Sequence, residues 1–76
     1  MTETIYVALL DEGTAVWRPV PAIRVGSNDF VVLRPSDYDP EDERWEFEPG
    51  TVVRCELRHT AEGPALTAVS QARMIA

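Results

Sequence analysis

Short extended segments separated by turn residues constrain the fold of this chain most, because no stretch shows the 3.6-residue periodicity of a helix. The alternation is clearest in residues 51–59, whose two faces carry Val53, Cys55 and Leu57, and Arg54, Glu56 and Arg58. We predict strands at residues 4–10, 15–25, 30–34, 51–59 and 65–72. The chain is therefore expected to be an all-β protein.

The 76 residues are expected to form a single domain, 1–76, since a chain of this length has room for one core. Five short strands joined by tight turns, with one long loop, are typical of a small antiparallel SH3-like β-barrel. A closed barrel also leaves few exposed strand edges. An OB-like closure is the nearest alternative, but Pro35 and Pro40 disfavour the helix that this fold usually has before its fourth strand. Pro40 could begin one helical turn at most.

Prolines set the irregular positions of these strands. Pro19 and Pro21 interrupt residues 15–25, so we expect a kink there and a position at a sheet edge or bulge. The pair Pro49-Gly50 predicts a type II turn, with the glycine at the position that needs positive φ. In the short segment 45–47, alternation predicts that the two aromatic side chains face inward and the neighbouring glutamates face solvent.

The acidic charge is concentrated in one window, residues 37–48. This window holds seven carboxylates and one arginine, whereas six arginines balance six carboxylates elsewhere, so it carries the whole net charge of −6. That charge and a pI near 4.5 disfavour a nucleic-acid partner and favour a basic protein surface or a cation. The window overlaps the polar loop 35–44, and loops of this length are often functional.

Composition excludes further classes of protein. The longest aliphatic run, residues 7–10, has four residues, far below the roughly 20 of a membrane span, so no membrane partner is expected. The first residues lack the pattern of a signal peptide, and one cysteine cannot form an internal disulfide. A cytoplasmic location is therefore expected.

Two stretches resemble a group of uncharacterised short bacterial proteins. The first is VALLDEGTAVWRPV at residues 7–20, and the second joins Asp37-Tyr38-Asp39-Pro40, Trp45-Glu46-Phe47, Pro49-Gly50 and VVRCE at residues 52–56. Together they cover about half of the chain. The resemblance implies a small β fold and no particular activity.

A weaker likeness to SH3 domains rests on Ala8-Leu9-Leu10-Asp11-Glu12, which is similar to the Ala-Leu-Tyr-Asp-Tyr stretch of their first strand. Both tyrosines are missing here, and so is the adjacent tryptophan pair that builds the peptide groove. The likeness therefore implies the fold more than it implies proline-rich peptide binding.

No pair of residues favours an enzyme. Cys55 and His59 lie in one segment, but four residues of extended strand span about 13 Å, so thiol and imidazole cannot touch. We expect Cys55 in the core and His59 at solvent, with no catalytic residue and no cofactor. The acidic window imitates an EF-hand loop, but Asp42 stands where that loop needs glycine and Pro40 stiffens it, so no metal site is predicted.

Aromatic residues are interleaved with the acids, and tryptophan, tyrosine and arginine dominate protein interfaces. The candidate partner-binding residues are Asp37, Tyr38, Asp39, Glu41, Asp42, Glu43, Trp45 and Trp17. In a second interpretation the two tryptophans close the two ends of a small core. That interpretation leaves Tyr38 as the exposed aromatic residue of the loop.

We therefore expect a non-enzymatic interaction module that docks a basic protein partner through its acidic aromatic loop, for example an immunity or inhibitor protein against the basic cleft of a nuclease. Reversing the charges of Asp39, Glu41 and Glu43 should then abolish binding and leave the fold intact. The alternative is a structural or assembly subunit that uses the barrel edge at residues 19–23. SH3-like peptide binding or weak divalent-cation binding is a second alternative, and the oligomeric state stays open.

Overall fold

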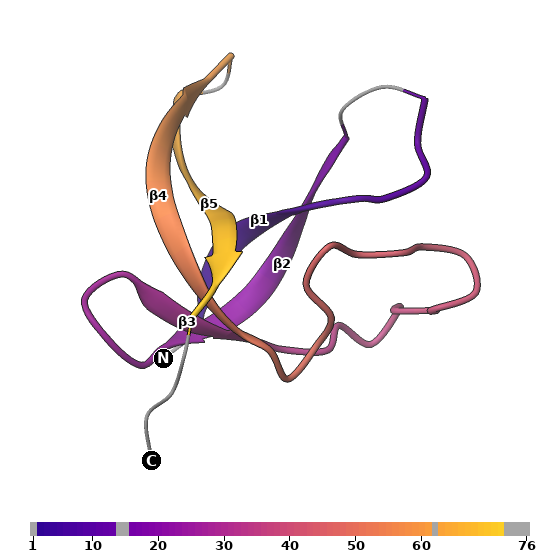
Figure 1. The fold of residues 1–76 in the computed structure, drawn as a ribbon, viewed down its shortest axis with the longest axis horizontal. Helices are drawn as coiled ribbons and strands as arrows, with labels where there is room; N and C mark the ends of the chain where they lie inside the picture. Colours follow the sequence, from indigo (N-terminus) through magenta and orange to yellow (C-terminus); the bar gives the residue numbers. More distant parts are fainter. Residues whose placement is uncertain (1, 14–15, 62, 73–76) are drawn as a thin grey trace.

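The computed structural model describes residues 2–13, 16–61 and 63–72, and within these ranges it contains five β-strands and no helix (Figure 1). The strands are β1 (Glu3–Ala8), β2 (Trp17–Arg24), β3 (Asp29–Val32), β4 (Val52–Thr60) and β5 (Gly63–Gln71). Each strand overlaps one of the five predicted segments. The all-β class is confirmed.

The strands form a closed barrel in sequential order, β1-β2-β3-β4-β5. Consecutive strands pair antiparallel, as predicted, but β5 closes the barrel against β1 through a parallel pair at Tyr6 and Thr67. The parallel closure follows from the odd number of strands, because the first and fifth strands of an up-and-down meander run in the same direction. The sequential order is consistent with an SH3-like barrel and differs from the Greek-key order of an OB-fold.

The two prolines of β2 lie in a continuous strand, and the bulge expected as one possibility for this stretch does not occur in its pairing with β1. The register with β1 runs without a shift through both prolines, and a register shift lies instead in the β4–β5 pair, between Arg54 and Cys55. Pro21 directs its carbonyl oxygen away from β1 and accepts the Leu33 N–H at 2.9 Å. Pro19 has the same orientation, because backbone groups alternate along a strand. Neither missing N–H therefore removes a bond to β1, and both prolines face the β3 side of β2, where the β2–β3 pairing includes neither proline.

The segment before β4 follows the sequence pattern. Gly50 has a positive φ of 92°, and the Thr51 N–H donates to the Glu48 carbonyl oxygen at 3.1 Å, which closes the predicted turn. The side chain of Trp45 is buried and that of Phe47 is half-buried, whereas the glutamates beside them are exposed. The alternation predicted for residues 45–48 is confirmed.

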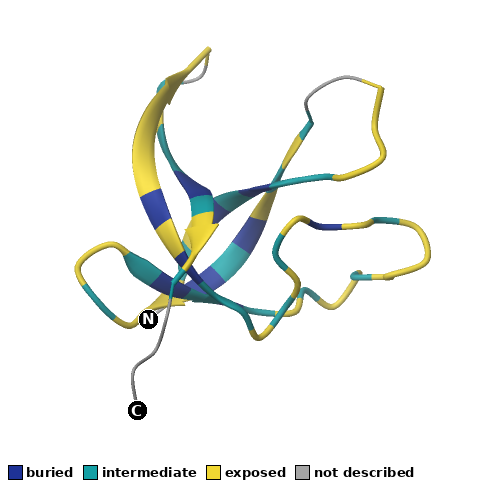
Figure 2. Cartoon of the chain, in the orientation of Figure 1, coloured by how far each residue is buried: buried dark blue, intermediate teal, exposed yellow. Residues whose placement is uncertain are grey.

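The core fills the barrel with alternate residues of the strands (Figure 2). Its buried members are Ile5, Val7, Val20, Ala22, Phe30, Val32, Trp45, Val53, Cys55 and Ala68. Alternation predicts Leu57 in the same core, but Leu57 is 65% exposed. The reason is that β4 and β5 extend past the barrel as a hairpin, where no described residue buries the side chain of Leu57. Figure 2 shows this outer half of β4 as exposed.

Candidate functional site

The acidic loop 35–44 is folded by its own backbone. The carbonyl oxygen of Asp39 accepts the N–H groups of Asp42 and Glu43 at 3.1 and 3.0 Å, and its Oδ1 accepts the Glu41 N–H at 2.9 Å. These bonds define a single helical turn, in which Pro40 occupies the first position because it has no N–H to leave unpaired. Asp39 therefore caps this turn as well as adding charge to the surface.

The end of the acidic loop is attached to the chain that follows β1. Leu9 and Trp45 form an isolated antiparallel bridge. Beside it, the Leu10 N–H donates to the Arg44 carbonyl oxygen at 2.7 Å. These bonds place the acidic loop next to the β1–β2 connection, although more than thirty residues of chain separate the bonded positions (Figure 1).

Arg18 of β2 joins the loop to the barrel through a group that we call the Arg18 cluster: Arg18, Asp37, Tyr38, Glu43 and Trp45. Arg18 Nη2 lies 3.1 Å from both carboxylate oxygens of Asp37, and its Nε lies 2.7 Å from Glu43 Oε1. Its guanidinium carbon lies 5.3 Å from the Trp45 ring centroid, within cation–π range. The Arg18 side chain is 17% exposed, and it gives two of the candidate docking acids a partner inside the molecule.

The two aromatic candidates of the loop pack inward. Trp45 is 2% exposed, and its Nε1 donates to Glu43 Oε1 at 3.3 Å. Tyr38 packs edge-on against it, with 4.7 Å between ring centroids, and Arg34 lies 5.5 Å from the Tyr38 ring. The prediction that Tyr38 is the exposed aromatic is therefore wrong. Trp45 is buried where a partner cannot contact its ring.

Trp17 does not join the other candidates. It is 41% exposed, so the interpretation that it closes one end of the core is wrong. It lines a separate cleft of about 370 Å³ with Tyr6, Arg58, His59, Thr60, Ala61 and Thr67. The acidic loop contributes no described residue to this cleft. Trp17 is therefore not part of a surface shared with the loop acids.

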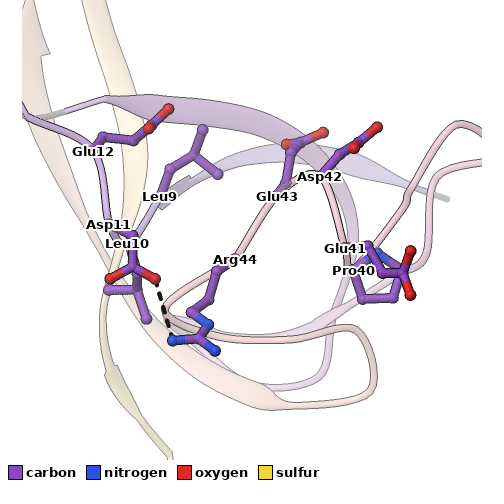
Figure 3. Close-up of a pocket in the computed structure, with 9 residues that line it drawn as sticks. All are labelled: Leu9, Leu10, Asp11, Glu12, Pro40, Glu41, Asp42, Glu43 and Arg44. Carbon is purple, nitrogen blue, oxygen red and sulfur yellow. Dashed lines mark hydrogen bonds and ion pairs between the residues drawn. The ribbon is translucent and has the colours of Figure 1, made fainter.

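Carboxylates of the loop meet carboxylates of the β1–β2 connection at a cleft of about 470 Å³, which we call the acidic cleft (Figure 3). Its lining residues are Leu9, Leu10, Asp11, Glu12, Pro40, Glu41, Asp42, Glu43 and Arg44. Among these described residues five are carboxylates and one is a cation. Arg44 Nη1 reaches across the cleft to Asp11 Oδ2 at 3.1 Å, and both side chains are largely exposed.

Sequence analysis missed three residues of this region: Arg18, Asp11 and Glu12. All three belong to the part of the chain whose charges balance, so the charge count hides them. The nearest signal is the position of Asp11 and Glu12 in a turn, since a turn of an antiparallel meander can meet another loop at the same end of the barrel. No local pattern relates Arg18 to Asp37 and Glu43.

Cys55 is a core residue. It is 2% exposed, and burial raises the pKa of its thiol from 9.0 to about 11, while Arg24 lowers this pKa and Asp29 raises it. A thiol with this pKa is protonated at neutral pH and is a poor nucleophile. His59 is exposed on the hairpin beyond the barrel. Among the residues that the structure describes, no three His, Cys, Asp or Glu side chains are placed to hold a metal ion.

These observations define a small acidic β-barrel with an ordered loop and an acidic cleft. No family model matches the chain, and neither a curated protein nor a solved structure matches it. The resemblance to short bacterial proteins therefore stays a prediction. In the described ranges no helix has the length and apolar character to cross a membrane.

Proposed function

We propose that this protein is a non-enzymatic interaction module that docks a basic protein partner at the acidic cleft. The observation that carries the proposal is that five carboxylates from two separate loops line one cleft, where Arg44 is the cation among the described lining residues. A cleft lined mainly by one sign of charge focuses the electric field and attracts a surface of opposite charge.

The Arg18 cluster supports this proposal because it orders the acidic loop before any partner binds. A preformed surface loses less conformational entropy on association than a flexible one. Glu41 and Asp42 stay exposed at the cleft, where an arginine of the partner can form bidentate pairs with them. One concrete form of the function is an immunity or inhibitor protein whose carboxylates occupy the basic cleft of a nuclease.

The geometry decides which variant tests the function. Reversing Asp39 and Glu43 removes the cap of the helical turn and a partner of both Arg18 and Trp45. The expectation that reversing Asp39, Glu41 and Glu43 together leaves the fold intact therefore has no structural support. Reversing Glu41 and Asp42 changes the charge of the cleft and leaves the Arg18 cluster in place.

The test is a pull-down from a lysate of the source cells with three immobilised proteins. These are the wild type, Glu41→Arg with Asp42→Arg, and a control with Glu46→Arg and Glu48→Arg. The control has the same net charge, and its two positions are exposed outside the cleft lining. We expect the wild type and the control to retain one basic protein that the cleft variant loses. Equal retention by all three proteins, each folded by circular dichroism, would exclude the acidic cleft as the docking surface.

The alternative assembly function at residues 19–23 has less support. Pro19 and Pro21 face that edge of β2 and have no N–H to donate to an added strand. The Pro21 carbonyl oxygen is already bonded to the Leu33 N–H. An incoming strand would therefore find few free backbone groups along this stretch.

A further inference from the structure

The outer half of β4 has an open backbone edge. β4 pairs with β5 from Val53 to Thr60, but its pairing with β3 ends at Arg54. The next bond on the β3 side is from the Cys55 N–H to the Asn28 carbonyl oxygen at 2.8 Å. Beyond Cys55, the described part of the chain supplies no strand on that side. Figure 1 shows the hairpin of β4 and β5 extending away from β3 and from the acidic loop.

The backbone N–H and C=O of Leu57 point toward this open edge. Cys55 donates toward β3, and backbone direction repeats every two residues along a strand, so Leu57 has the same direction. His59 of β4 lies opposite Pro64 of β5, and proline has no N–H with which to form a hydrogen-bonded pair. The backbone groups of His59, and by alternation those of Leu57, therefore point away from β5. An edge with unpaired groups is a template for another strand.

The side chains beside this edge are self-complementary. Leu57 is 65% exposed, and Glu56 and Arg58 flank it on the opposite face of the strand. Their contact within the chain is long, 3.9 Å from Arg58 Nη2 to Glu56 Oε1, and both side chains are more than half exposed. Both charges are therefore available to a neighbouring strand.

We propose that a second copy of this chain adds to the edge, antiparallel, with a two-fold axis at Leu57. In this register each Leu57 exchanges its N–H and C=O with Leu57 of the other copy. Glu56 then lies opposite Arg58 of the other copy, and Arg58 opposite its Glu56. These are non-hydrogen-bonded positions, where side chains approach most closely and opposite charges stabilise the pair. The interface is isologous, as two-fold dimers require.

The neighbouring registers are disfavoured. A two-fold axis at Glu56 places two glutamates opposite each other. An axis at Arg58 places two arginines opposite each other. Like charges directly opposite destabilise a strand pair, so the axis at Leu57 is the one that the charges select.

Sedimentation equilibrium of the intact protein up to about 1 mM tests this dimer. We expect the wild type to dimerise, and Glu56→Arg or Arg58→Glu alone to weaken the dimer at least tenfold because like charges then meet. Glu48→Arg has the same net charge as Glu56→Arg and is its control, so it should dimerise like the wild type. A mixture of the two single variants should form a heterodimer, and a protein carrying both changes should recover the homodimer.

Exchanging the two charges distinguishes a loss of strand pairing from misfolding. Each single variant places like charges opposite each other in its homodimer, whereas the mixture of both variants places opposite charges together. A monomeric wild type at the highest concentration overturns the proposal. So does dimerisation that neither single change weakens, or a mixture that associates no better than its components. The acidic cleft is not part of this edge, so the result is independent of the proposed docking function.

Discussion

Replacing Arg18 by methionine tests the interpretation that the Arg18 cluster orders the acidic loop. Methionine keeps an unbranched apolar side chain over Trp45 but removes the guanidinium group. Glu43 then loses its contact at 2.7 Å, Asp37 loses both contacts at 3.1 Å, and the Trp45 ring loses its cation–π partner.

The size of the effect follows from the exposure of each partner. The Asp37 side chain is 75% exposed, so its pair is screened by water and contributes about 0–0.5 kcal/mol. Glu43 is better shielded, and its pair contributes about 1 kcal/mol. The cation–π contact adds about 0.5–1 kcal/mol. We expect Arg18→Met to lower the free energy of unfolding by about 2 kcal/mol, and the midpoint of thermal unfolding by about 8–16 °C.

Urea unfolding of Arg18→Met measures this loss, with Trp45 fluorescence as the probe in a Trp17→Phe background. Double-mutant cycles with Asp37→Asn and with Glu43→Gln separate the two ion pairs. The coupling of Arg18 to Glu43 should exceed its coupling to Asp37. A loss below about 0.5 kcal/mol, or a stronger coupling to Asp37, would contradict the assignment of Glu43 as the better-shielded partner of Arg18.

Four further substitutions test other parts of the structure, with urea unfolding followed by circular dichroism. Trp45→Ala should cost about 3–5 kcal/mol because it empties the core, whereas Trp17→Ala at an exposed position should cost less than about 1 kcal/mol; similar losses would contradict the assigned burial. The raised pKa of Cys55 favours the folded state while the thiol is protonated, so stability should fall as the pH rises from 9.0 toward about 11, by up to about 2–3 kcal/mol, and Cys55→Val should remove that fall. Gly50→Ala should cost about 1 kcal/mol because φ is 92° while open space surrounds the site, and an unchanged stability would contradict the positive φ.

The acidic cleft and the open edge of β4 are separate surfaces of one small barrel. The cleft is lined by the acidic loop and the β1–β2 connection (Figure 3). The open edge lies on the hairpin of β4 and β5 (Figure 1). A two-fold dimer through Leu57 therefore leaves the cleft of each copy available to a partner. In that arrangement a dimer presents two acidic clefts, which raises the apparent affinity for a partner with two basic sites.

Sequence alone determined the strands, the turns and the direction in which side chains point. Alternation placed Val53 and Cys55 in the core and the aromatic residues of 45–47 inward, because a strand has a fixed period of two whatever surrounds it. Proline and glycine chemistry located the turn at Gly50 for the same local reason. The charge window 37–48 also follows from sequence, since formal charges need no fold.

Which of these side chains are covered, and which charges are paired, depends on the tertiary structure. Alternation gives Leu57 the same direction as Cys55, but the barrel covers one and ends before the other. Arg18 meets Glu43 because the fold brings the acidic loop against β2, a contact between positions 25 residues apart that no local pattern encodes. Burial and ion pairing depend on distances set by packing, and packing is a property of the whole chain.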